Sequence, residues 1–231
     1  MVTKLGSFNL YPLIGYVDAS NAVLDQGSDG IQQFLFFLGT SATFGDFGFE
    51  AEFNYFDLKT DVAGADDYDR YGIYGNGWWN IGAGKVGLLA AYGSWDNDAG
   101  TGFGFGEDFT PTVFGADWAS IGTTGRSEYM AVTMLQLYGS LALSEELSLW
   151  GNGTYWMSNS DEQANGDDDF WKDADGYEID LGLDWKLTDQ VTYSIAGGFG
   201  KISLDSNDAN DANGDSPDSF ARLYHRFKID F

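Results

Sequence analysis

The sequence predicts an all-β fold: a transmembrane up-and-down antiparallel β-barrel of about ten strands, formed as a single domain by residues 1–231. Three observations predict this fold. Apolar and polar residues alternate with a period of two along many segments, very short turns alternate with long polar connections, and most of the negative charge lies in those long connections.

The alternation is clearest in residues 177–187. Every odd position there is apolar, whereas every even position is charged or glycine. Because successive side chains of a strand point to opposite faces, this segment has one apolar and one polar face. The same pattern occurs in 47–58, 71–81 and 219–231. Aromatic residues near both ends of the apolar faces, such as Tyr177 and Trp185, predict two belts at membrane interfaces.

Ten strands follow from the pattern. In chain order they are about 5–17, 31–43, 47–59, 69–82, 85–95, 127–142, 147–158, 176–187, 190–203 and 219–231. Short turns fall at 44–46, 83–84, 144–146 and 188–189, and long polar connections at 18–30, 60–68, 96–126, 159–175 and 204–218. An even strand number with short turns at one end and long connections at the other is typical of a membrane barrel.

The net charge of −25 is concentrated in the long connections. They and their flanking residues hold 24 of the 36 acidic residues, against only Arg126 and Lys172 as bases. This division predicts that one end of the barrel lies in water beyond a membrane, with a solvated acidic surface. The acidic connection residues of interest are Asp161, Asp167, Asp168, Asp169, Asp205, Asp208, Asp211 and Asp215.

The polar faces predict a charged lumen. By alternation the inward residues include Glu50, Glu52, Glu178, Asp180, Asp184, Arg222, Arg226 and Lys228. We expect the tenth strand to close on the first, so that the basic stripe faces the acidic one across or beside the lumen. Two alternatives remain open: a salt-bridged plug, or a charged constriction that selects ions. The inward residues at 192–200 are small enough to leave a channel beside a plug formed by the charges.

The last nine residues, Leu223 to Phe231, carry a resemblance. They alternate apolar residues and end in an aromatic one, which is similar to the C-terminal β-signal of Gram-negative outer-membrane β-barrels. The whole chain resembles that porin-like class. This resemblance implies a place in the bacterial outer membrane, contact with lipid and lipopolysaccharide, and recognition of Phe231 by the barrel assembly machinery.

A second resemblance lies in Phe103 to Pro111, which is similar to loops of porins of the alginate-exporter type. Barrels of that type have more than ten strands. The resemblance therefore leaves open whether this chain is a complete small barrel or the C-terminal part of a larger one.

Composition excludes several other classes. The chain has no Cys, which excludes thiolate metal sites, and its acidity excludes a nucleic-acid partner. His225 is the single imidazole, and it is expected to point outward without a placed nucleophile or acid, so we expect no enzyme of the omptin or barrel-phospholipase kind. Calcium in the acidic connections is the one cofactor hypothesis, although neither acidic run fits an EF-hand loop.

These observations predict a channel that lets small solutes or cations pass, with the connection 96–126 as a constriction or lid. The alternative is a non-conducting structural or binding barrel whose acidic connections contact glycan, divalent cations or a partner protein. In either case a homo-oligomer or a cell-surface partner is compatible with the sequence. Alternation and charge do not distinguish the two functions.

Overall fold

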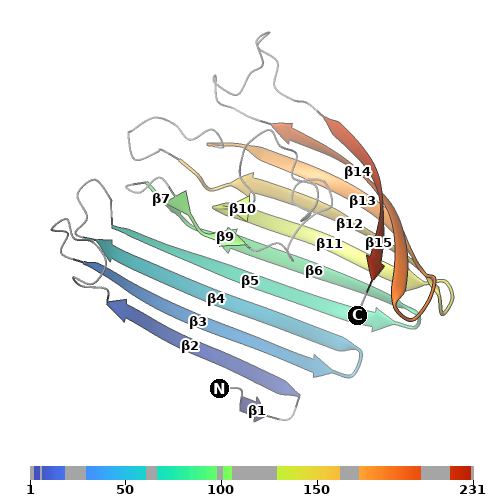
Figure 1. The fold of residues 1–231 in the computed structure, drawn as a ribbon, viewed down its shortest axis with the longest axis horizontal. Coiled ribbons are helices and arrows are strands. Elements are labelled where there is room, and N and C mark those ends of the chain that lie inside the picture. Colours follow the sequence, from blue (N-terminus) through green and yellow to red (C-terminus); the bar gives the residue numbers. More distant parts are fainter. Residues whose placement is uncertain are drawn as a thin grey trace, which may run out of the picture.

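The computed structural model describes residues 3–5, 7–18, 30–60, 67–97, 101–105, 129–161, 172–203 and 219–229. Within them, one antiparallel sheet has the spatial order β1-β2-β3-β4-β5-β6-β11-β12-β13-β14-β15 (Figure 1). Its strands are β1 Thr3–Leu5, β2 Phe8–Asp18, β3 Ile31–Phe44, β4 Phe47–Thr60, β5 Tyr68–Ile81, β6 Gly84–Gly93, β11 Val132–Ala142, β12 Leu147–Ser158, β13 Asp175–Lys186, β14 Val191–Ser203 and β15 Phe220–Ile229.

The predicted ten strands are confirmed as the ten long strands of this sheet, in an up-and-down order. Two boundaries were wrong. The first predicted strand divides at Ser7 into the three-residue β1 and the long β2. The predicted strand 127–142 joins the sheet only at Val132, because Ala131 adopts a left-handed backbone with φ 49° and there diverts the chain out of the ladder.

The predicted short turns are confirmed and lie together at one end of the sheet, here called the short-turn end. Gly45 and Gly82 adopt φ near +58° in two of them, a conformation that suits glycine. Ser144 and Thr188 shape the other two by accepting backbone N–H groups from residues two and three positions later. The described part of the chain contains no helix long and apolar enough to cross a membrane.

The turn after β13 also carries an exposed ion pair. Lys186 Nζ lies 2.8 Å from the carboxylate of Asp189. Hydrogen bonding and attraction from this ammonium lower the pKa of the Asp189 carboxyl below its ordinary value. Because both groups are in water, the pair is a local feature of the turn and contributes little to the fold.

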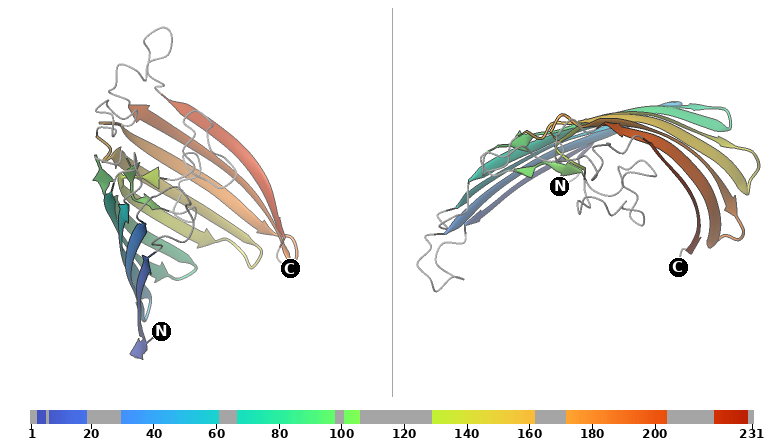
Figure 2. Two further views of the ribbon diagram at one scale, coloured as in Figure 1. Left: turned by 60° about the vertical axis from the view of Figure 1, so that its left-hand side comes forward. Right: turned by 90° about the horizontal axis from the view of Figure 1, so that it is seen from above.

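The sheet curves into an open arch (Figure 2). The predicted closure of the tenth strand on the first is wrong within the described residues: β15 pairs with β14, and β2 pairs with β1 and β3. The physical reason is the gentle curvature, which leaves the two edges apart in both views. Barrel diameter grows with strand number, and the ten long strands of this sheet do not close on themselves within the described residues.

The convex face is apolar and the concave face polar, as the alternation predicts. On β13, Ile179 and Leu181 are 56% and 62% exposed on the convex face, whereas Glu178 and Asp180 are each 1% exposed on the concave face. Trp185 and Tyr177 are half exposed near opposite ends of that strand. They are about 26 Å apart along it at ~3.3 Å per residue, comparable to the ~25 Å apolar band of an outer-membrane barrel.

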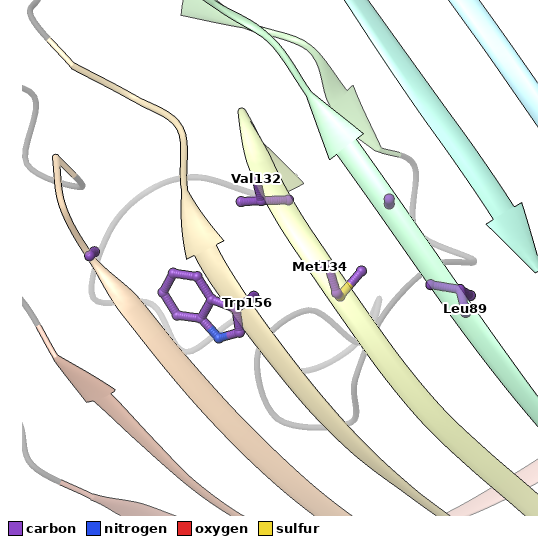
Figure 3. Packing of buried hydrophobic residues seen from close by; sticks show 6 residues of the cluster. Leu89, Val132, Met134 and Trp156 are labelled. Atoms are coloured by element: carbon purple, nitrogen blue, oxygen red, sulfur yellow. The ribbon is translucent and has the colours of Figure 1, made fainter.

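The concave face also carries a hydrophobic cluster that the alternation did not predict. Leu89, Val132, Met134 and Trp156 are buried there (Figure 3). Two small ribbons connect β6 to β11 beside it: β7 (Trp95–Asp96) with β8 (Thr101–Gly102), and β9 (Gly104–Phe105) with β10 (Tyr129–Met130). Phe103, between β8 and β9, packs on this cluster and lies directly over Gly72 of β5.

Candidate functional site

Three strands bring the predicted acids and bases of the lumen together in rows. Backbone pairing aligns Asp180 with Gly198 and Gly198 with Arg222, so one glycine separates the acid from the base. Four residues closer to the short-turn end, Ser194 stands between Asp184 and Arg226 in the same way. Adjacent strands are about 4.8 Å apart, so the acid and the base of each row stand on strands about 10 Å apart, with one small residue between them.

This arrangement explains the burial of the middle strand. Ser194 and Ala196 are 7% and 2% exposed, and Gly198 is buried as well, because long side chains from β13 and β15 lie on either side of them. The small residues of β14 therefore stand between the acids of β13 and the bases of β15, and Asp180, Arg222 and Arg226 all have interaction partners.

Glu50 lies in a different network, on β4. Tyr74 O–H donates to Glu50 Oε1 at 2.5 Å, and Asn76 Nδ2 donates to the same oxygen at 3.1 Å. Tyr138 O–H donates to Asn76 Oδ1 at 2.9 Å from β11, crossing the intervening strand β6. The Glu50 carboxylate is thus bound by β5, and the expectation that Glu50 and Glu52 face the basic stripe stays a prediction.

Aromatic rings on the concave face lie flat over glycines of neighbouring strands. Trp78 covers Gly48, Tyr138 covers Gly87, and Trp150 covers Gly182, so closely that a Cβ atom at any of these glycines would collide with the ring. Glycine is the one residue that lets a ring approach the backbone of the next strand in this way. Lys85 places its ammonium over the rings of Trp78 and Tyr138, at 5.6 and 5.2 Å.

The remaining predicted residues have simpler positions. Glu178 is buried on β13, and Lys228 is exposed on β15 opposite Thr192. His225 is exposed on the convex face beside Tyr193, as expected, with ring centroids 6.1 Å apart. The described residues contain no group of three side chains suited to hold a metal ion.

Of the acidic connection residues, the structure describes one. Asp161 pairs with Lys172 Nζ at 2.7 Å, between the ends of β12 and β13. The others lie outside the described residues, as does the terminal aromatic Phe231: Asp167, Asp168, Asp169, Asp205, Asp208, Asp211 and Asp215.

Sequence reasoning missed Tyr74, Asn76, Tyr138 and Trp150. All four occupy inward positions of the alternation, and that is the one signal that points to them. Their partners lie 24 to 62 residues away in the chain for the hydrogen bonds, so the strand register is needed to find the pairs.

Comparison with known proteins supplies the fold class. No family model matches this chain, and no curated protein matches it. Solved outer-membrane proteins do match over nearly its whole length. OmpT, an outer membrane protein of Vibrio cholerae, is 14% identical with a TM-score of 0.50, covering 98% of this chain and 62% of that chain.

Two further structures agree. An anion-selective porin from Comamonas acidovorans is 14% identical with a TM-score of 0.50, covering 98% of this chain and 55% of the porin. OccK2 of Pseudomonas aeruginosa is 12% identical with a TM-score of 0.52, and the match covers 96% of this chain and 57% of OccK2. The chain thus has the fold of a porin-like outer-membrane β-barrel, which confirms the predicted class, and it spans less than two thirds of the length of these proteins.

Proposed function

We propose that this chain forms part of the wall of a bacterial outer-membrane channel for passive passage of small solutes. The observation that carries the proposal is the division of the sheet into an apolar convex face and a charged, hydrogen-bonded concave face. The convex face contacts lipid and lipopolysaccharide, and the concave face lines the lumen. The short-turn end is periplasmic and the acidic connections are extracellular.

The wall has more than ten strands. In a bilayer every backbone N–H and C=O needs a partner, so the free edges at β1–β2 and β15 must pair with further strands. The matched porins support this part of the proposal, since ten strands of this chain superpose on 55 to 62% of their lengths. A homo-oligomer of such barrels and recognition of β15 by the barrel assembly machinery belong to the same proposal.

The connection between β6 and β11 narrows the lumen. Its described base bends over the concave face, where Phe103 N–H donates to Ser94 O at 2.9 Å and Arg70 Nη1 donates to Gly102 O at 3.2 Å. Asn159 ties the same base to β6 by donating to Gly93 O at 2.8 Å. A base held on the inner wall by hydrogen bonds from Arg70 and Asn159 side chains supports the role of this connection as a constriction.

Solute passage, rather than catalysis, is the proposed activity, and cations are the favoured ions because of the acidic connections. The test is single-channel recording in planar bilayers from the assembled barrel that contains this chain. Stable ohmic steps are the expected result. Absence of conductance from protein that is demonstrably folded and inserted would contradict the channel and favour the structural or binding alternative.

A further inference from the structure

A hollow of about 550 Å³ lies on the concave face near the short-turn end. Serines form its floor, and larger polar or aromatic groups stand around it: Ser140, Ser148, Ser194, Trp150, Asp184 and Arg226. Its volume falls within the ~300–1,000 Å³ of small-molecule sites.

The strand register produces this hollow. One row runs across the sheet from Ser148 through Asp184 and Ser194 to Arg226. The adjacent row runs from Ser140 through Trp150, Gly182 and Ala196 to Tyr224. In both rows a small residue of β14 stands in the middle. A longer side chain of β12 or β13 stands on one side of it and a longer side chain of β15 on the other, so the surface is hollowed along β14.

Trp150 gives the hollow an apolar platform. Its indole lies on the backbone of β13 at Gly182, so one ring face is covered by the sheet, and the residue also lines the hollow. Trp78 lies over Gly48 in the same manner, but Lys85 stands 5.6 Å from its ring centroid. Trp150 lines this hollow, and Trp78 is not among the residues that line it.

The polar groups around this platform have no net charge. Asp184 supplies carboxylate acceptors, Arg226 supplies planar guanidinium donors, and Tyr224 and the serines do both. The acid and the base cancel, and they lie in one row with Ser194 between them. Such a set suits a solute that carries many hydroxyl groups and no charge, because each hydroxyl both donates and accepts hydrogen bonds.

We propose that this hollow is a binding subsite for a neutral carbohydrate on the periplasmic side of the lumen. The C–H face of a sugar ring packs on the exposed face of Trp150, while its hydroxyls bond to Asp184, Arg226 and Ser148. The subsite rests on the proposed channel, since it names a solute class for the same lumen, but its binding is measurable without any current.

The test is titration calorimetry of the full chain, folded in detergent, with glucose, maltose and sucrose as probes at high salt. We expect at least one neutral sugar to bind more tightly than glucuronate or glucosamine. Trp150→Ala is expected to weaken that binding about tenfold, because it removes the platform. The matched control Trp78→Ala removes a ring over a glycine outside the hollow and is expected to leave sugar affinity within about twofold.

A second variant guards against misfolding of Trp150→Ala. Ser148→Leu keeps the indole and fills the hollow, so it is expected to abolish sugar binding while the thermal unfolding of the protein stays near wild type. Failure of all three neutral sugars to bind, tighter binding of glucuronate, or equal effects of the two tryptophan variants would overturn the subsite. Conductance without sugar, measured on the same preparation, reports separately on the proposed channel.

Discussion

Asp180 and Leu181 are neighbours in the sequence and lie in opposite environments. The carboxylate is 1% exposed on the concave wall, in the same row as Arg222, whereas the leucine is 62% exposed on the convex face. A side chain so exposed and so apolar, in the middle of a strand whose whole convex face is apolar, is explained by contact with lipid. The environment of each residue therefore follows from its parity in the strand.

Arginine at Leu181 tests this assignment. A charge at the middle of the lipid-facing band costs about 2–4 kcal/mol of folding free energy in an outer-membrane barrel. We expect Leu181→Arg to show that loss in urea unfolding of the protein in lipid vesicles. Glu52→Arg, which puts the same group at an exposed concave position of β4, serves as the control and is expected to cost far less. Equal losses for the two variants would contradict a membrane-facing convex surface.

The ring seated on Gly48 makes a second residue-scale prediction. Alanine there pushes its Cβ into the indole of Trp78, so Gly48→Ala is expected to destabilise the protein by about 1–3 kcal/mol. Gly75 on β5 has no atom within 4 Å of an added Cβ. Gly75→Ala is therefore expected to be neutral or to stabilise by up to ~1 kcal/mol. The same unfolding assay measures both variants. An unchanged free energy of unfolding for Gly48→Ala would show that the Trp78 indole does not need the close contact with the Gly48 backbone.

At the scale of elements, the sequence was most informative where one face of a strand meets lipid. The ten long strands and the four short turns were predictable because period two is strong there. The start of β11 was not. Residues Met130 to Leu135 are largely apolar on both faces, since Val132 and Met134 pack under the connection from β6. Apolar residues on both faces remove the alternation of apolar and polar residues, and that loss was the available signal.

The candidate site was predictable only in part, for a related reason. Alternation placed Asp180, Asp184, Arg222 and Arg226 on one face, but not in shared rows. Residues of neighbouring strands share a row only in one alignment, or register, of those strands. The register depends in turn on where each turn leaves residues unpaired. The hollow was hidden for the same reason, because its floor is made by serines from three strands that only the aligned sheet brings together.

Phe103 is the residue to change in the connection between β6 and β11. It fills the space over Gly72 and packs on the buried cluster around Met134. We expect Phe103→Ala to destabilise the protein by roughly 2–4 kcal/mol and to raise the single-channel conductance, since the base of the connection loses its anchor. An unchanged conductance in a variant that is measurably less stable would show that this connection does not narrow the lumen.

The end of β15 predicts a defect in assembly. An aromatic residue, Phe231, follows this strand two positions after its last residue in the sequence. We expect Phe231→Asp, or its deletion, to lower the fraction of folded protein in outer membranes of a Gram-negative host, as seen by heat-modifiable migration on gels. His225→Ala, on the convex face of the same strand, is the control and is expected to assemble normally. Normal assembly of both would make the β-signal resemblance accidental.

At the scale of the whole molecule, charge is separated along the strands. The long connections carry most of the net charge of −25, whereas the described concave wall balances acids with bases. A field of this kind acts over about one Debye length, ~10 Å at 0.1 M salt. In the proposed channel we therefore expect the acidic connections to act on ions outside the lumen, and the rows of β13 to β15 to act on what passes within it.

Salt dependence distinguishes these two sets of charges. We expect cation preference in reversal potentials at low salt, fading as salt rises, because charges at the mouth are screened. Neutralising the aspartates of 205–218 is expected to weaken the preference at low salt only. Asp184→Asn, within the wall, is expected to change it at every salt concentration. An anion preference in dilute salt would contradict the role of the acidic connections.

The rings seated on glycines have a consequence for how the sheet assembles. They join β4 to β5, β6 to β11 and β12 to β13, so they are distributed over most of the arch. If any of these pairs slipped by one residue, a side chain with a Cβ would lie where the glycine belongs, and the lipid-facing and lumen-facing sets would exchange. Each ring thus fits only the correct alignment. Together the three rings disfavour misaligned strands while the wall assembles.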